Sequence, residues 1–328
     1  MKTMSLFRIA VIITCLGLFV ACNKNSSGTN STTTTVDDLQ AQSDDQTMAS
    51  NEDDAMNNDA DAALSSNANV AGSSVNSTQN GTISEMGVNG TDSAAVVCDA
   101  TITFGTTDTT RTVTITYNGS NCWGNRTRTG SIIISIPLTV HWTDQGAVVT
   151  ITVDNLKITR VRDNKSITFN GVKTITNVTG GLLKNLASLL TITHDISSTL
   201  TITYNNGKTA TWNVSKHRVF TYNNGVEITT TGTHNDGTNA DVAEWGTNRF
   251  GVSFESLITE PKVIDQSCDY RLTSGENEII NSKGATATIT YGLDSTGAPT
   301  SCPGTGSYYA KLVYVAPNGK VYTYIFPY

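Results

Sequence analysis

Short runs of alternating β-branched and polar residues dominate the chain after residue 96 and constrain its fold more than any other feature. In residues 112–117, for example, Thr alternates with Val, Ile and Tyr. Such period-two alternation indicates half-buried antiparallel strands. Further runs of this kind occupy residues 131–136, 148–153, 166–169, 200–204, 226–231 and 308–315.

Asn-Gly pairs punctuate these runs and favour tight hairpins, because both residues tolerate positive φ. They lie at residues 118–119, 206–207, 224–225 and 318–319. Only residues 182–190 have a pattern compatible with a helix. We therefore predict an all-β domain over residues 96–328 with about 14 to 16 strands. An antiparallel β-sandwich and a long curved sheet built from hairpins both remain open, as do one core and two subdomains.

Residues 22–95 differ in amino-acid composition from the rest of the chain. Between residues 23 and 95 there are eleven acids, one base and no aromatic side chain. A segment with so little apolar surface cannot offset its ordering entropy, so we predict a disordered acidic tether over residues 22–95. Residues 96–328 carry 18 basic and 17 acidic residues and show no basic patch. That balance argues against nucleic acid as a partner.

The N-terminus has the pattern of a secretory signal. Lys2 and Arg8 precede a short apolar run, and Ala21 stands before Cys22. The run is too short to span a bilayer, which needs about 20 residues. Residues 1–21 resemble a bacterial lipoprotein signal peptide, with residues 18–22 as the lipobox. The resemblance implies fatty acyl chains, such as palmitate, on Cys22 and an outer-membrane location, on either the periplasmic or the cell-surface face. An ordinary signal peptide would instead leave Cys22 as a free thiol.

Four cysteines follow in the β-domain: Cys98, Cys122, Cys268 and Cys302. In an exported chain they imply two disulfides, for which three connectivities exist. Residues 96–140 and 268–328 share the order Cys-Asp, Thr-rich strand, Cys, Gly and strand, so they are related hairpin units. This repeat favours the pairs Cys98–Cys122 and Cys268–Cys302. Metal ligation is the competing interpretation, but the spacings match no compact metal box.

The order of these motifs resembles an uncharacterised family of Bacteroidota lipoproteins. The similarity rests on the Cys-Asp and Thr-Ile-Thr-Tyr-Asn-Gly elements, on residues 124–130, 171–177 and 246–251, and on the closing Cys268 and Cys302 segment. It covers nearly all of residues 96–328. The resemblance implies an exported, lipid-anchored β-protein and carries no known reaction, ligand or catalytic residue.

Catalytic signals are sparse. No two of the four histidines are spaced as a short zinc-binding pair, and His194-Asp195 lacks a Gly-x-Ser-x-Gly elbow, so we predict a surface histidine there. Acids near Trp245 allow a glycosidase site but are equally consistent with solvated loops. They are Asp241, Glu244, Glu255 and Glu260. Residues 235–241 partly match a calcium loop but favour an Asx-type turn.

Two further features allow a binding role. Trp123, Trp142, Trp212 and Trp245 could form a ligand face, although Trp212 favours core packing because Ala210 and Val214 share its face. Arg126 and Arg128 point to one side of a strand, either as an anion clamp or as a charged hairpin edge.

The sequence thus predicts a membrane-anchored envelope lipoprotein with a non-enzymatic structural, adhesive or ligand-binding β-domain. No cofactor, metal site or catalytic residue is expected. The expected partners are a membrane, reached through the N-terminal lipid, and a glycan or an envelope protein. A glycan-processing hydrolase and an apolar-ligand carrier are the alternatives. A carrier would require a closed or half-closed barrel around a cavity.

Overall fold

The computed structural model describes residues 36–72, 97–121, 124–304 and 306–328, which belong to one compact unit, Val36–Tyr328. The signal sequence, Cys22 and Cys122 lie outside the described residues. Among the residues that are described, no helix has the length and apolar character needed to cross a bilayer.

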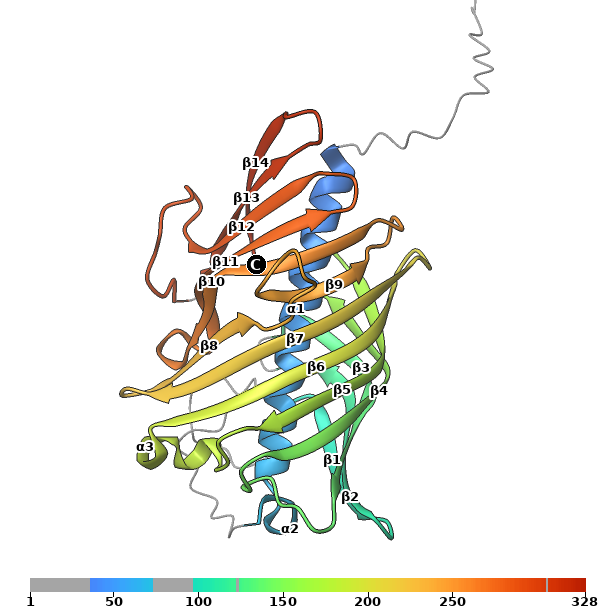
Figure 1. Cartoon of the computed structure of the whole chain (residues 1–328), viewed down its shortest axis with the longest axis vertical. Helices are drawn as coiled ribbons and strands as arrows, with labels where there is room; N and C mark the ends of the chain where they lie inside the picture. Colours follow the sequence, from blue (N-terminus) through green and yellow to red (C-terminus); the bar gives the residue numbers. More distant parts are fainter. Residues whose placement is uncertain (1–35, 73–96, 122–123, 305) are drawn as a thin grey trace, which may run out of the picture. The chain divides into compact units, whose positions relative to one another are not determined.

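One antiparallel sheet of 14 strands forms the body of this unit (Figure 1). Its strands are β1 (Ala100–Thr106), β2 (Thr110–Ser120), β3 (Arg126–Pro137), β4 (Ala147–Arg160), β5 (Ser166–Asn177), β6 (Thr191–Tyr204), β7 (Thr209–Tyr222), β8 (Val226–Gly232), β9 (Val242–Thr247), β10 (Ser253–Asp265), β11 (Arg271–Asn281), β12 (Thr286–Leu293), β13 (Tyr309–Val315) and β14 (Val321–Pro327). Consecutive strands pair with one another except β8 and β9: β8 pairs with β10, and β9 pairs with β10 and with β7. The all-β prediction is confirmed, as a curved sheet and not as a sandwich.

The Asn-Gly pairs at 206–207, 224–225 and 318–319 form hairpin turns, with positive φ at Gly207, Asn224 and Gly319. The pair at 118–119 does not form a turn. It lies inside β2, because the pairing of β2 with β3 continues to Ser120 and the chain turns only after that residue. The short helical stretch expected at 182–190 is present as η1 (Leu183–Asn185) and α3 (Leu186–Leu189).

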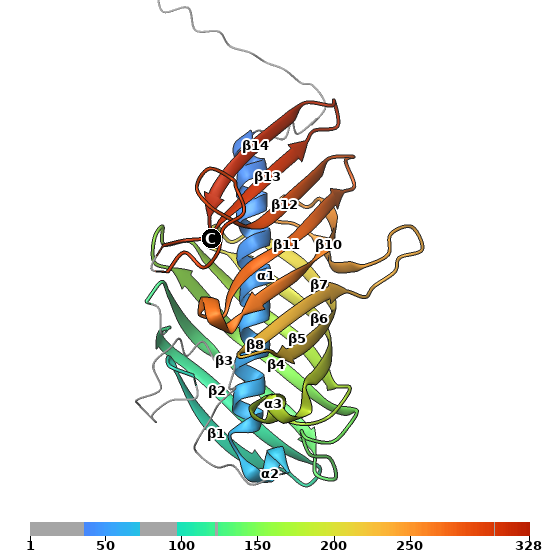
Figure 2. The ribbon, with the colours of Figure 1, turned by 90° about the vertical axis from the view of Figure 1, so that its left-hand side faces the viewer.

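The largest difference from the sequence analysis lies in the acidic tether. Residues 36–71 form a 30-residue helix, α1 (Val36–Ser65), and a short helix, α2 (Ala68–Ala71). Most of α1 from Ser43 onward is buried, and it runs through the concave side of the sheet (Figures 1 and 2). The prediction of disorder is therefore wrong for residues 36–71, because it treated the acids as solvated although they face cations of the sheet.

Local sequence favours this helix only weakly. Residues 36–71 contain no Gly or Pro, but Asp, Asn and Ser are poor helix formers. A helix that is polar all round does not persist alone in water, so its stability comes from the sheet. At its end, the side chain of Asn67 caps α2, and Gly72 terminates it in the left-handed conformation. The carbonyls of Val70 and Ala71 accept hydrogen bonds from Trp142 and Thr143, which fixes the end of the helix.

The core is one apolar cluster that joins α1 to the inner face of the sheet. The helix contributes small and flexible side chains, chiefly Ala together with Met48, Met56 and Leu64. The inner faces of β2 to β7 supply Ile, Val, Phe and Trp at alternate positions. Sheet curvature is assisted by Gly130, which has φ +100° at a register shift between β3 and β4, where a Cβ atom would lie 2.2 Å from the carbonyl oxygen of Asn155.

Candidate functional site

The concave face of the sheet carries a row of cations that face α1 between Asp44 and Asp61. At the N-terminal end, Arg160 of β4 donates to Asp44 at 2.7 Å, and Lys165 lies 2.5 Å from Asp44 and 2.5 Å from Asp45. Arg249, from the loop after β9, pairs with Asp45. These contacts attach the third turn of α1 to both halves of the sheet.

The middle of α1 carries the most deeply buried charges. Asp53 pairs with Lys173 of β5, and both side chains are 0% exposed. Lys216 of β7 lies 3.5 Å from Asp53 and 2.8 Å from Glu244 of β9. Arg126 of β3 pairs with Glu52 at 2.8 Å. Opposite charges from several strands therefore meet around one helical turn.

Towards the C-terminal end, Asp59 accepts hydrogen bonds from Arg128 at 2.7 Å and from the Tyr117 hydroxyl at 2.9 Å. Arg128 also forms a bidentate pair with Asp99, at 2.7 and 2.6 Å. His194 of β6 lies 3.4 Å from Asp61 and packs between Trp142 and Phe220. Charged pairing thus extends along α1 from Asp44 to Asp61.

Burial and pairing compete in setting the protonation of these groups. Burial alone would raise the pKa of Asp54, but Lys216, Lys262 and Arg218 together lower it. Burial likewise opposes the charge of Lys216, yet Asp54, Glu244 and Asp53 raise its pKa. For Lys173 and Lys262 burial dominates and lowers the pKa. The interior therefore holds charges that are stable only while their partners are in place.

The pairing of Asp44 predicts a specific loss of stability in acid. Burial opposes its ionisation, but hydrogen bonds from Arg160 and Lys165 lower its pKa from 3.8 to about 2. The stabilisation from a depressed pKa is present above pH 3.8 and is lost as the pH falls towards 2. In urea unfolding at pH 5, the free energy of unfolding of Asp44→Asn should be lower than that of the parent by about 2 kcal/mol. This difference in free energy should become smaller by pH 2.5. A difference that stays constant with pH would contradict this assignment.

Two adjoining hollows, which we call the open-side cleft, lie above the same helix, with volumes of about 220 and about 370 Å³. The floor is a stripe of α1 residues that includes Asn51, Asp54 and Asn58. One wall is formed by Asn121, Asn125 and Arg126. The other is the segment 269–272 with Tyr308 and Tyr328. Strands from the two ends of the sheet therefore face each other across α1.

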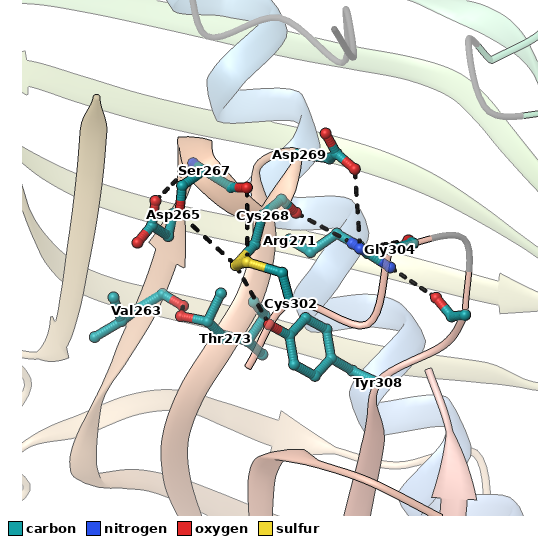
Figure 3. Close-up of a disulfide and its surroundings, with 12 residues drawn as sticks. Val263, Asp265, Ser267, Cys268, Asp269, Arg271, Thr273, Cys302, Gly304 and Tyr308 are labelled. Carbon is teal, nitrogen blue, oxygen red and sulfur yellow. Dashed lines mark hydrogen bonds and ion pairs between the residues drawn. A yellow bond between two sulfur atoms is a disulfide. The ribbon is translucent and has the colours of Figure 1, made fainter. Parts of the chain in front are cut away.

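The disulfide Cys268–Cys302 stabilises the second wall (Figure 3). The Tyr308 hydroxyl donates to the Cys268 Sγ at 3.4 Å. Arg271 donates to the carbonyls of Cys268, Gly304 and Gly306 at 2.8–3.1 Å, which ties the loop before β13 to β11. Arg271 is thus committed to backbone contacts and holds the wall in place.

The predicted pairing of Cys268 with Cys302 is confirmed, with 5.1 Å between the Cα atoms. Cys98 is disulfide-bonded as well. Its expected partner, Cys122, and the expected lipidation site, Cys22, both lie outside the described residues. The pairing of Cys98 with Cys122 and the acylation of Cys22 stay predictions.

The expected surface position of His194 is wrong. Its side chain is 1% exposed, because it occupies an inward position of β6, while the adjacent Asp195 points outward and contacts His217 at 2.6 Å. The two residues lie on opposite faces of the sheet and cannot act together. Trp212 is buried, as its alternation pattern predicts.

The acids around Trp245 do not converge on one site. Glu244 is buried on the inner face, where it binds Lys216 and accepts a hydrogen bond from Gln46 at 2.8 Å. Trp245 stacks on His234, and Glu255 accepts from Asn239 at 2.8 Å. Glu244 and Glu255 therefore lie on opposite faces of the sheet and do not flank one sugar bond.

Residues 235–241 form Asx-type turns. The Asp236 Oδ1 accepts from the backbone N–H groups of Thr238 and Asn239, at 2.7 and 2.6 Å. No cluster of three or more metal-ligating side chains exists within the described parts of the chain. The anion-clamp interpretation of Arg126 and Arg128 is supported by the geometry, and the anions are carboxylates of the same chain.

The sequence analysis missed the cleft because its floor belongs to α1. One signal was available: 36 consecutive residues, 36–71, contain neither Gly nor Pro, and Gly72 follows them. Comparison with models of known protein families, with curated proteins and with solved structures found no match.

Proposed function

We propose that this protein is an exported, lipid-anchored envelope protein whose β-domain captures a ligand at the open-side cleft without chemical turnover. The anchor rests on the lipobox at residues 18–22. Cys22 lies only 14 residues before α1 begins at Val36, so an extended connection spans at most roughly 50 Å. A fold that starts this soon after the anchor holds its cleft near the membrane.

The observation that carries the binding role is the state of the cleft carboxylates. Asp44 and Glu52 are ion-paired with Arg160 and Arg126. The pKa values of Asp44 and Asp54 lie below the ordinary value, which is the opposite of what a general acid requires at neutral pH. A binding surface is the better description of such a cleft.

The apolar-ligand carrier has less support. A curved sheet could enclose an apolar cavity, but its concave face is filled by α1. The glycan-processing hydrolase lacks a converging pair of acids among its candidates. Nucleic acid binding is also disfavoured, since many of the basic side chains point inward to the helix.

Cell fractionation with matched cysteine variants tests the anchor. We expect the parent and Cys15→Ser to fractionate with membranes and to incorporate labelled palmitate. Cys22→Ser should lose both properties, because lipidation of one thiol provides the whole attachment. If Cys22→Ser were retained in the membrane fraction as well as the parent, the proposed lipid anchor would be contradicted.

A further inference from the structure

We propose that the open-side cleft binds a neutral oligosaccharide. This inference rests on the proposed function of the domain as a capture protein. It deepens that function by naming the ligand class and the side chains that recognise it.

The charged groups of the cleft are already committed. Arg160 donates to both Asp44 and Asp163, and Arg126 pairs with Glu52. Arg271 donates to three backbone carbonyls and lies 3.9 Å from Asp269. Arg162 donates to the Pro327 carbonyl at 3.1 Å and lies 3.8 Å from Asp44, and Asp54 lies 3.5 Å from Lys216. An anionic ligand would have to displace these partners. A cation would find no group of three ligating side chains in the ranges that the structure describes.

The polar groups of the cleft that remain available to a ligand are neutral. The amide of Asn51, which lines both hollows, has no hydrogen-bond partner among the described residues, nor does the Tyr270 hydroxyl. Asn58 accepts from Arg218 at 3.0 Å through Oδ1, which leaves its NH₂ group to donate. An amide offers a donor and an acceptor side by side, which suits the adjacent hydroxyl groups of a sugar.

The wall opposite Asn125 is aromatic and rigid. The rings of Tyr308 and Tyr328 are stacked with centroids 6.2 Å apart. The Tyr328 hydroxyl donates to the Leu272 carbonyl at 2.7 Å and accepts from the Gly292 N–H at 3.0 Å. Tyr308 is 1% exposed and supports the half-buried ring of Tyr328 from beneath. The Tyr328 ring therefore provides the flat apolar area for the C–H face of a sugar ring, while the amides bind its hydroxyls.

The position of Tyr270 is also fixed by unusual backbone geometry. Asp269 and Tyr270 are consecutive non-Gly residues with φ of 61° and 54°. Such conformations cost energy and persist where the surroundings impose them, often at binding sites. Here they bring Tyr270 into the same hollow as Asn51 and Asn58.

The size of the cleft suits a short chain of sugar units. The two hollows lie at or below the lower end of the range of about 300–1,000 Å³ for ligand pockets. Both are lined by Asn51, Asn125 and Tyr328, so a ligand that spans them contacts these residues at its centre. Asn51 is therefore the side chain whose loss should weaken binding most.

Calorimetric titration of the soluble mature chain carrying Cys22→Ser tests the inference. The probes are cello-, chito-, malto- and manno-oligosaccharides of increasing length. We expect one series to bind, Asn51→Ala to weaken it about tenfold, and Tyr270→Phe to weaken it less. Asn51→Ala should fold normally, because Ala is a better helix former than Asn. Asn205→Ala, an exposed Asn in the β6–β7 turn, is the matched control and should bind like the parent.

Three outcomes separate this inference from the function on which it rests. Absence of binding to every series, or equal affinity of Asn51→Ala and the parent, overturns the oligosaccharide site. If the soluble chain still sediments with isolated envelopes in that case, the capture function stands. Binding that depends on Asn51 but releases new reducing ends keeps the site and overturns the non-enzymatic function.

Discussion

Replacement of Asp53 by Asn should lower the free energy of unfolding by about 3–5 kcal/mol, the usual cost of removing one partner from a buried ion pair. The side chain of Lys173 is 0% exposed, and its ammonium group would lose its paired carboxylate. Burial already lowers the pKa of Lys173, so the remaining amine would be driven towards its neutral form. Urea unfolding at neutral pH measures the loss.

A second variant distinguishes an uncompensated charge from a packing defect. Combining Asp53→Asn with Lys173→Met removes both charges and should recover most of the lost stability, since an apolar replacement of a buried pair is often neutral. Asp108→Asn, an exposed acid in the β1–β2 turn, should stay within about 0.5 kcal/mol of the parent. A loss below 1 kcal/mol for Asp53→Asn alone would show that α1 does not depend on this pair.

The charges of α1 fix the position of the helix, which its apolar side chains cannot do alone. Its buried apolar side chains are mostly Ala, which would allow the helix to shift along the groove. Pairs at both ends, such as Asp44 with Arg160 and Asp59 with Arg128, specify one position. Buried polar groups are best attested in this role of fixing register.

The sheet could be predicted from the sequence because strand signals are local. Alternation in β2 to β7 and turn residues such as Asn206 and Gly207 specify both strand and hairpin. Asn118 and Gly119 are an exception: their local sequence favours a turn, but the hydrogen-bonded pairing of β2 with β3 continues through both residues.

The helix and the cleft could not be predicted in the same way. Asp53 and Glu52 in isolation are typical of a solvated segment, and their partners Lys173 and Arg126 lie 120 and 74 residues away. Composition measures whether a segment can bury apolar surface, but it does not record that a distant sheet supplies matching charges. The shared side of Arg126 and Arg128 on their strand was predictable, whereas their inward direction and their carboxylate partners Glu52 and Asp59 were not.

The central claim is that the acidic segment 36–71 is an integral part of the folded domain. If so, its amides open only with the sheet, at a free energy of several kcal/mol. The tether interpretation predicts instead that these amides remain in contact with water.

Hydrogen exchange of the full mature chain tests this most directly. We expect amides of residues 44–64 to exchange about 10⁴-fold or more slowly than in an unstructured peptide, with the same opening free energy as β4 to β7. Exchange of these amides within seconds, beside a protected sheet, would contradict the account.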